Sequence, residues 1–340
     1  MATQYNTRIV LASRPTGKPA AHNFRLETVE VPSPGEGEVL LRNRLLSLDP
    51  YMRGRMDEGP SYAAPVPIDG VMEGRTVAEV LVSRHAGFAP GQWVVATGGW
   101  QTHAVVPGTS LSRKLDPDGP PLSTALGVYG MPGFTAYAGL LEIGQPKSGE
   151  TLVVAAASGP VGATVGQLAR MRGARAVGIA GGESKRRYLE DIGFDVALDH
   201  RAPGFVDALA AAVPDGIDIY FENVGGAVFE AVVPHLNNFA RIPVCGTVST
   251  YNTRHRAPQG PDQLPGFISQ VLRKRWTVRG FIQTDFAALF PEFEAKMRHW
   301  LLNGEIQYRE DVVDGLERAP QALLGLLEGQ NFGKLLVKLD

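Results

Sequence analysis

Between residues 151 and 283, short apolar runs alternate with amphipathic segments. Runs that are apolar throughout are typical of strands buried on both faces, and an amphipathic segment after each run indicates a covering helix. Six runs follow this pattern, at residues 151–156, 174–180, 195–200, 217–225, 240–246 and 276–283. Strands that alternate with helices predict a parallel sheet, so we expect a doubly wound α/β fold in this part of the chain.

Two glycines mark the ends of predicted helices. Gly173 and Gly193 each follow an amphipathic segment and precede an apolar run. Glycine is favoured just beyond a helix because it adopts the left-handed conformation without steric cost. These positions therefore support the predicted alternation of helices and strands.

The first third of the chain is different, because it is rich in Pro and Gly and its strand-like runs are short. Those runs lie at residues 38–47, 75–82 and 92–97. Short runs separated by turn-forming residues predict a β-rich unit with irregular loops.

The C-terminal tail contains a helix candidate at residues 319–328 and a strand candidate at 334–339. The α/β sheet needs no seventh strand, so we expect the tail to fold back on the N-terminal unit. This interpretation predicts a discontinuous domain of residues 1–125 and 306–340, with an α/β domain of residues 126–305 inserted in it.

Composition and charge exclude several classes of protein. The chain has 340 residues, of which 44% are hydrophobic and 20% charged, which is typical of a folded protein with two domains. A formal net charge of −2 offers no global attraction for nucleic acid. The sequence shows no signal peptide and no apolar run of the roughly 20 residues that cross a membrane, so a cytoplasmic location is expected. Cys245 is the only cysteine, which excludes an intrachain disulfide.

A glycine-containing turn follows the first strand of the predicted sheet. Ala157, Gly159 and Gly162 occupy the three glycine positions of a G-x-G-x-x-G motif, with alanine in the first, and Pro160 and Val161 lie between the last two. Such a turn lets the backbone approach a pyrophosphate, which the helix N-terminus then binds. Because the turn lies within six alternating strands and helices, we interpret it as a Rossmann dinucleotide site.

The end of the second strand indicates which dinucleotide binds. NAD-binding units carry an acidic residue there that binds the ribose hydroxyls, but this strand ends in Ala180, Gly181 and Gly182. Lys185, with Arg186 and Arg187, follows instead and can bind a 2′-phosphate. Glu183 opposes this interpretation, yet the group as a whole favours NADP(H).

Seven segments together resemble the leukotriene B4 dehydrogenase/prostaglandin reductase and double-bond reductase branch of the zinc-independent medium-chain dehydrogenases/reductases. They are LSLDPYMRGRM at 46–56, GMPGFTAYAGLLEIG at 130–144, AASGPVGATVGQLAR at 156–170, FENVGG at 221–226, CGTVSTYN at 245–252, RGFIQ at 279–283 and NFGKLLVKL at 331–339. The resemblance covers nearly the whole chain. It implies a GroES-like catalytic domain beside the Rossmann domain, NADPH as hydride donor, a cytoplasmic enzyme and a homodimer.

The resemblance also implies which residues bind the cofactor. Lys185 would hold the 2′-phosphate, and His200 stands where the family usually has a tyrosine beside that phosphate. The other positions implied to line the cofactor are Asn223, Cys245, Gly246, Thr247, Ser249, Tyr251, Phe281, Ile282 and Asn331.

The residues present do not predict a metal site or a hydrolytic nucleophile. The chain has one cysteine, and its seven histidines include no pair spaced to face one metal ion on a helix. Met72 lies where zinc-dependent relatives carry a histidine. No G-x-S-x-G motif is present, and Ser158 belongs to the phosphate turn.

Without a Lewis acid, the simplest chemistry at a nicotinamide site is reduction of an enone or enal, which leaves negative charge on the carbonyl oxygen. A hydrogen-bond donor must stabilise that charge, and Tyr251 is the candidate that both its position and the resemblance favour. Tyr51 is a candidate for substrate contact from the catalytic domain, although its position in the sequence slightly favours a packing role. Arg254, His255 and Arg256 form a basic run that we interpret as a solvated loop.

Two alternative functions remain at this point. The first is an NADPH:quinone reductase on the same scaffold, because quinones are also enones. The second is a protein that binds NADPH as a sensor or structural component without turnover. The physiological substrate depends on pocket shape, which sequence patterns do not determine.

Overall fold

The computed structural model describes residues 5–253 and 262–339. The chain forms two compact units, one of Met1–Gly127 with Glu310–Asp340 and the other of Val128–Arg309. Leu126 is buried against Leu336 in the first unit, whereas Ile306 is buried in the core of the second. The two crossings between the units therefore lie just after residues 127 and 309.

The second unit contains a six-stranded sheet in which every neighbouring pair is parallel. Its strands are β8 (Thr151–Ala155), β9 (Arg175–Ala180), β10 (Val196–Asp199), β11 (Ile217–Phe221), β12 (Leu236–Val244) and β13 (Thr277–Gly280). They are arranged in the order β10-β9-β8-β11-β12-β13. With the strands counted from β8, this is the Rossmann order 3-2-1-4-5-6, which confirms the predicted fold class.

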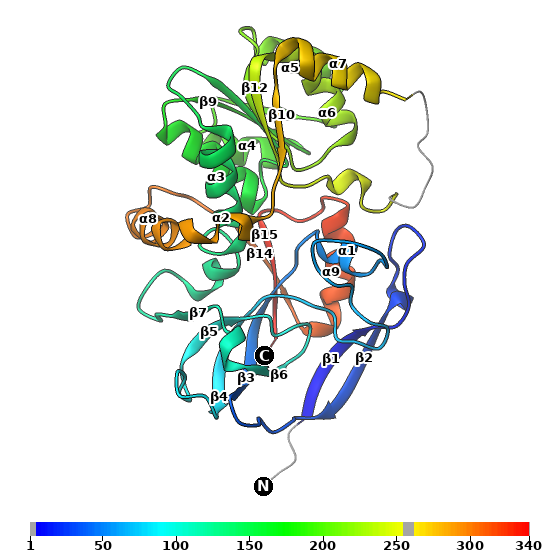
Figure 1. Ribbon diagram of the computed structural model, residues 1–340, viewed down its shortest axis with the longest axis vertical. Coiled ribbons are helices and arrows are strands. Elements are labelled where there is room, and N and C mark those ends of the chain that lie inside the picture. The colour runs from blue at the N-terminus through cyan, green and yellow to red at the C-terminus, as the bar shows by residue number, and fades with distance from the viewer. Residues whose placement is uncertain (1–4, 254–261, 340) are drawn as a thin grey trace. The chain divides into compact units, whose positions relative to one another are not determined.

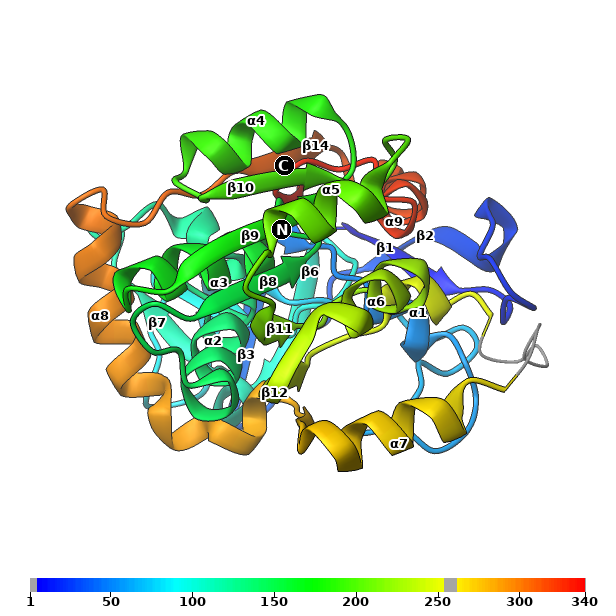
Figure 2. The same ribbon diagram turned by 90° about the horizontal axis from the view of Figure 1, so that it is seen from above.

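Helices cover both faces of this sheet (Figure 1, Figure 2). They are α2 (Met131–Ala138), α3 (Pro160–Met171), α4 (Glu183–Asp191), α5 (Phe205–Ala212), α6 (Gly226–Val232), α7 (Leu264–Lys274) and α8 (Phe290–Leu302). Leu152 and Val154 are buried on the face of α2, α3, α4 and α8, whereas Val153 and Ala155 are buried with α5, α6 and α7. Within the described ranges, no helix is long and apolar enough to cross a membrane.

Two strands end several residues before their predicted runs do, β11 at Phe221 rather than residue 225 and β13 at Gly280 rather than residue 283, and the fifth strand begins before its predicted run. The apolar pattern placed the fifth strand at residues 240–246, but β12 begins at Leu236, directly after a 3-10 turn at Val233–His235. Between Ile217 and Ile219 the pairing on β12 moves from Leu236 to Arg241, and Phe239 within this interval has a φ of 64°. The extra residues form a bulge, which interrupts the apolar pattern and conceals the beginning of the strand. Gly173 and Gly193 have φ values of 78° and 91°, which confirms their predicted role after helices.

The first unit is built on strands of mostly antiparallel pairing. Its strands are β1 (Tyr5–Leu11), β2 (Phe24–Glu30), β3 (Glu38–Ser47), β4 (Thr76–Ser83), β5 (Trp93–Ala96), β6 (His103–Pro107), β7 (Arg113–Leu115), β14 (Glu310–Asp314) and β15 (Lys334–Lys338). The larger sheet has the order β14-β15-β3-β4-β5-β7, with β6 also paired to β3. Two helices complete the unit, α1 (Met52–Arg55) and α9 (Ala319–Leu327). The C-terminal strand β15 lies antiparallel to β3.

A buried ion pair joins these distant segments of the first unit. Lys334 Nζ lies 2.8 Å from Asp49 Oδ1 and donates to the Leu48 carbonyl oxygen at 2.7 Å. Both charged residues are buried, and Ser47 also donates to the Asp49 carboxylate. The ion pair therefore fixes the backbone between β3 and α1 to the C-terminal strand.

We expect Lys334→Met to destabilise the first unit by about 3 to 5 kcal/mol, because the buried Asp49 carboxylate would lose its compensating charge. Lys338→Met is the matched control, since Lys338 lies on the same strand and is exposed. Chemical and thermal unfolding of the two variants tests this expectation. Equal stability of both variants would show that the ion pair contributes little.

Candidate active site

The turn between β8 and α3 has the geometry of a phosphate-binding site. Ala156 adopts the left-handed conformation, with a φ of 51°, and its carbonyl oxygen accepts a hydrogen bond from the Gly159 N–H at 3.0 Å. A Cβ atom at Gly162 would lie 2.6 Å from both Ala156 O and Ala157 Cα, so no side chain fits at this position. Gly159 is the N-cap of α3 and Pro160 its first residue. The free amides and the dipole at the start of α3 can therefore bind an anion.

The basic group at the start of α4 is divided by ion pairs within the helix. Arg186 Nε lies 2.8 Å from Glu183 Oε2 and Arg186 also contacts Glu190, while Arg187 Nε lies 2.9 Å from Glu183 Oε1. Hydrogen bonds from Arg186 and then Arg187 lower the pKa of Glu183 to about 2. The charges of Glu183 and Glu190 thus offset those of the two arginines, and Lys185, which is half-buried, is the residue of this helix that the resemblance assigns to the 2′-phosphate.

His200 lies at the end of β10, beside the end of β9. Its backbone N–H donates to the Ala180 carbonyl oxygen at 3.0 Å. Its Nε2 atom is 3.0 Å from the position that a Cβ atom would take at Gly181. The residue is exposed as a whole, but partial desolvation of the ring, followed by the charges of Arg201 and Lys185, lowers the pKa of His200. The charged form of the imidazole is therefore disfavoured relative to an unperturbed histidine.

Arg201 is a residue that the sequence interpretation missed. Its Nε atom would lie 2.8 Å from a Cβ atom at Gly181, so the guanidinium lies across the end of β9 next to His200. The only signal in the sequence was a second basic residue after the third predicted strand.

The ends of β8, β11 and β12 are joined by hydrogen bonds at one edge of the sheet. Asn223 Nδ2 donates to the Ala155 carbonyl oxygen at 2.9 Å, which links the end of β11 to the end of β8. The backbone N–H groups of Cys245 and Gly246 donate to the Glu222 carbonyl oxygen at 2.9 and 3.2 Å. This edge lies where the strand order reverses, the usual ligand-binding position of such sheets.

Glu222 is a second residue that the sequence interpretation missed, and it holds the loop after β11. Its side chain is buried, and Oε1 accepts hydrogen bonds from the N–H groups of Val224 and Gly225 at 2.5 and 2.9 Å. Burial raises the pKa of Glu222, although these amides oppose the shift. The sequence signal was an acidic residue directly after an apolar strand, in the segment FENVGG.

This loop in turn supports the segment that carries Tyr251. The carbonyl oxygen of Asn223 accepts from the Val248 N–H at 3.3 Å, and that of Val224 accepts from the N–H and hydroxyl of Ser249 at 3.0 and 2.6 Å. A Cβ atom at Gly225 would lie 3.5 Å from Thr247 Cβ. The two loops are therefore packed together at the sheet edge.

The Tyr251 side chain folds back over its own segment. Its hydroxyl oxygen lies 3.2 Å from the position of a Cβ atom at Gly246, and the Asn223 carbonyl oxygen lies 3.4 Å from the same position. The residue directly follows a short 3-10 helix at Val248–Thr250 and is half-buried. A phenol group is therefore placed next to the loop that ends β11.

The remaining predicted cofactor residues of this unit are Phe281, Ile282 and Cys245, and they differ in whether the side chain is buried. The Phe281 ring is buried and makes an edge-on contact with Phe221 at a centroid distance of 6.2 Å. Its backbone N–H donates to the Val244 carbonyl oxygen at 3.3 Å, so the main chain rather than the ring lies at the strand end. The Ile282 N–H donates to Asp285. Cys245 is half-buried as a residue, while burial of its thiol raises the pKa to about 12.

Tyr51 and Asn331 belong to the first unit. Tyr51 precedes α1 and is half-buried, and burial, followed by the charges of Asp49 and Glu73, raises its pKa well above the usual value. Asn331 Nδ2 donates to the Gly333 carbonyl oxygen at 2.8 Å, just before β15.

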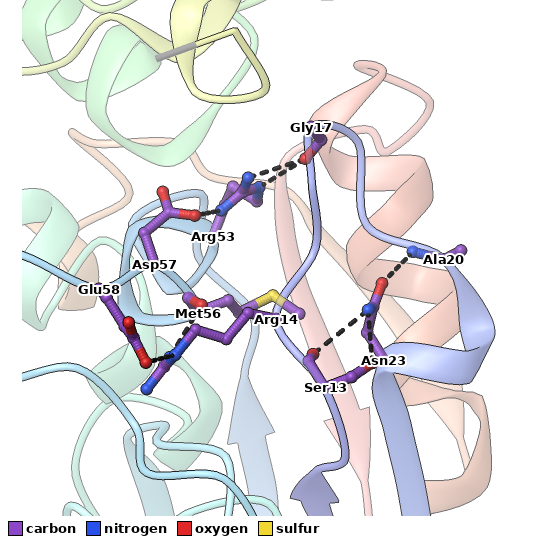
Figure 3. Close-up of polar contacts among 9 residues, drawn as sticks. All are labelled: Ser13, Arg14, Gly17, Ala20, Asn23, Arg53, Met56, Asp57 and Glu58. Atoms are coloured by element: carbon purple, nitrogen blue, oxygen red, sulfur yellow. Dashed lines mark hydrogen bonds and ion pairs between the residues drawn. The ribbon is translucent and has the colours of Figure 1, made fainter. Parts of the chain in front are cut away.

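Arginine side chains hold the segment after Tyr51 (Figure 3). The buried Arg53 donates to the Gly17 carbonyl oxygen at 2.8 Å and contacts Asp57 at 2.5 Å. Arg14 donates to the Met56 carbonyl oxygen at 2.9 Å and to Glu58 at 2.8 Å. These contacts fix the backbone of α1, the helix next to Tyr51.

No group of three or more His, Cys, Asp or Glu side chains in residues 5–253 and 262–339 is arranged to hold a metal ion. The basic run at Arg254, His255 and Arg256 lies outside the described residues.

Comparisons with known proteins agree with this architecture. Residues 7–113 match a family model described as the N-terminal domain of oxidoreductase, and residues 160–301 match one described as zinc-binding dehydrogenase. The chain is 55% identical to the NADPH-dependent curcumin reductase of Escherichia coli K12, over 99% of this chain and 97% of that protein. It is 42% identical to prostaglandin reductase 1 of Oryctolagus cuniculus, over 94% of this chain and 89% of that protein.

A solved structure shows the same fold along almost the full length. The crystal structure of CurA from Vibrio vulnificus in complex with NADPH superposes with a TM-score of 0.94 at 53% identity, covering 98% of this chain and 99% of that one. The chain therefore belongs to the zinc-independent reductase branch of the medium-chain dehydrogenase/reductase family, together with curcumin reductase and prostaglandin reductase 1.

Proposed function

We propose that this protein is an NADPH-dependent reductase of the carbon–carbon double bond of α,β-unsaturated ketones and aldehydes. The names of the relatives support the reaction class and the cofactor. The observation that carries the proposal is a shared location: the phosphate turn after β8, the basic end of β9 and the phenol of Tyr251 all lie at the carboxyl edge of one parallel sheet.

The described residues fit NADPH. At Gly162 a side chain would collide with the backbone, so helix α3 approaches β8 closely and its first amides are available for the pyrophosphate. Gly159, Pro160 and Val161 form the rest of this turn. Lys185 and His200 would face the 2′-phosphate at the end of β9. The loops of Asn223 and of Cys245, Gly246, Thr247 and Ser249 would contact the remainder of the cofactor, with the main chain of Phe281 and Ile282 and with Asn331.

Tyr251 is the residue that we assign to the chemistry. When bound, the nicotinamide of NADPH would supply a hydride to the β-carbon of the enone, and a proton from water would add at the α-carbon to give the saturated carbonyl compound. The Tyr251 hydroxyl donates a hydrogen bond to the carbonyl oxygen of the substrate, which becomes negatively charged as the hydride adds. This bond therefore strengthens in the transition state and lowers the barrier. The Glu222 and Asn223 hydrogen bonds hold the Tyr251 segment in place.

The two units would divide these tasks. We assign cofactor binding to the Rossmann domain, predicted at residues 126–305, and substrate contact to the GroES-like domain, predicted at residues 1–125 and 306–340. Within the latter, Tyr51 is the proposed substrate contact, and the arginine contacts to α1 support the backbone beside it.

The homodimer and the cytoplasmic location stay predictions. The second unit offers a surface compatible with self-association: all four residues of the edge strand β13 are exposed, and Leu264, Ile268 and Leu272 form an exposed apolar stripe on α7. An edge strand with free hydrogen-bonding groups and an adjacent apolar helix favours pairing with another copy of the chain.

We expect the purified protein to oxidise NADPH in the presence of simple enones and enals and to release the saturated carbonyl compound. NADH should be a poor substitute, because β9 ends at Ala180, is followed by Gly181 and Gly182, and has no acidic residue at its end to bind the ribose hydroxyls. Absorbance of NADPH and mass analysis of the product test this expectation. Formation of an allylic alcohol, a clear preference for quinones, or cofactor binding without turnover would each contradict it.

Tyr251→Phe keeps the aromatic ring and removes only the hydrogen-bond donor. We expect the turnover number to fall by roughly 10- to 1,000-fold, with the NADPH dissociation constant unchanged. Tyr137→Phe is the control, because it also removes a phenol hydroxyl that forms a hydrogen bond. That hydroxyl lies 2.7 Å from a Glu292 carboxylate oxygen and joins α2 to α8, away from the proposed site. Parental turnover in the Tyr251 variant would show that another group stabilises the enolate.

The proposed chemistry needs no metal ion, so prolonged treatment with a strong chelator should leave the enone reductase activity unchanged. The reason is the donor set, because the chain has a single cysteine and the described residues contain no suitable ligand cluster. Elemental analysis of the treated protein checks that metal was removed. Loss of activity that zinc restores would contradict the proposal.

A further inference from the structure

Arg201 occupies a defined position at the end of the second strand of the Rossmann sheet. The backbone N–H of Arg201 donates to Asp199 Oδ1 at 2.9 Å, which sets the direction of the chain after β10. Its Nε and Cζ atoms would lie 2.8 and 3.1 Å from a Cβ atom at Gly181, the first residue after β9. The guanidinium therefore occupies the space that a side chain at position 181 would take, and only glycine leaves that space open.

This position has a specific meaning in a dinucleotide-binding fold. The residue at the end of the second strand normally contacts the 2′ position of the adenosine ribose, as a carboxylate for NAD or with an arginine nearby for NADP. In this chain the strand end is Gly181, and the side chains over it are those of Arg201 and His200. A 2′-phosphate bound here would meet the guanidinium at the edge of the sheet.

The surrounding charges explain why one lysine is not enough. A phosphomonoester carries about −1.5 to −2 charges at pH 7. Desolvation, followed by the charge of Arg201, lowers the pKa of His200, so a protonated imidazole is disfavoured at this edge before a phosphate binds. Arg186 and Arg187 are paired with Glu183 on their own helix. The Asp199 carboxylate accepts hydrogen bonds from the backbone of Gly182 and Arg201. Arg201 lies at this strand end by its contact with Gly181, and both Arg201 and Lys185 are close enough to His200 to lower its pKa, so two permanent cations stand beside the expected phosphate position.

We propose that Arg201 is a second cationic contact for the 2′-phosphate of NADPH and that, with Lys185, it determines the preference for NADPH over NADH. This inference rests on the proposed function. A planar guanidinium can bind two phosphate oxygens at once, which an ammonium group cannot do. Arg201 thereby supplies the contact that a tyrosine hydroxyl would provide where His200 stands.

The test compares dissociation constants of NADPH, NADH and 2′,5′-ADP for the parental protein and for Arg201→Ala, Arg201→Lys and Lys185→Ala. Arg170→Ala is the matched control, because Arg170 is an exposed arginine near the C-terminal end of α3, paired with Asp195 at the opposite edge of the sheet. Thermal unfolding of each variant checks that the fold is retained.

We expect Arg201→Ala to weaken binding of NADPH and 2′,5′-ADP by roughly 10- to 100-fold, with NADH binding unchanged. Arg201→Lys should fall between the parental protein and the alanine variant. Arg170→Ala should bind all three ligands as the parental protein does.

The outcomes separate this inference from the proposed function. If the parental protein prefers NADPH and Lys185→Ala loses that preference while Arg201→Ala keeps it, the assignment of Arg201 is wrong and the function stands. An equal effect of Arg201→Ala on NADPH and NADH would also overturn the assignment. If the parental protein binds neither cofactor tightly, the proposed function itself fails.

Discussion

The position of β8 between β9 and β11 is the constraint on which the rest of the second unit depends. All neighbouring strands are parallel, so their carboxyl ends lie along one edge of the sheet. On one side of β8 lie β9 and β10, the next two strands along the chain. On its other side lie β11, β12 and β13. In sheets of this kind, ligands bind where the strand order reverses, because the helices that follow the two halves cover opposite faces. The phosphate turn and the Tyr251 segment both lie at this edge.

Buried charged side chains hold loops whose conformation the strand pairing does not determine. Glu222 is buried at the end of β11, and its carboxylate binds two consecutive backbone amides. Lys334 and Asp49 form a buried ion pair that connects β15 to the backbone before α1. Removing charges from water is costly, so each group contributes only while its partners remain in place. In both units these groups stand close in the chain to proposed site residues, Tyr51 in one and Asn223 in the other.

The electrostatics at the end of β9 depend on how α4 distributes its charges. Glu183 lies in the first turn of the helix, where a negative charge is favourable, and it is ionised far below neutral pH because two arginines donate to it. The acidic side chain that weakened the NADP interpretation is thus compensated within its own helix. The proposed cationic contacts at the strand end come from two places in the chain, Lys185 on α4 and Arg201 after β10.

The sequence by itself determined the features that local patterns encode. Strands buried on both faces give continuous apolar runs, and helices end at glycines, so the Rossmann unit, its phosphate turn and the roles of Gly173 and Gly193 were predictable. The family resemblance supplied the candidate site residues.

Only the tertiary structure decided the features that depend on distant segments. The bulge at Phe239 lies where the pairing between β11 and β12 changes register. It interrupts the apolar pattern of β12, so the beginning of this strand was not predicted. The Phe281 ring lies in the core because Phe221 on another strand packs against it. Arg201 lies over Gly181 because β9 and β10 are parallel neighbours with a common edge. Such contacts join residues far apart in the sequence, and their identity follows from strand pairing in three dimensions rather than from spacing along the chain.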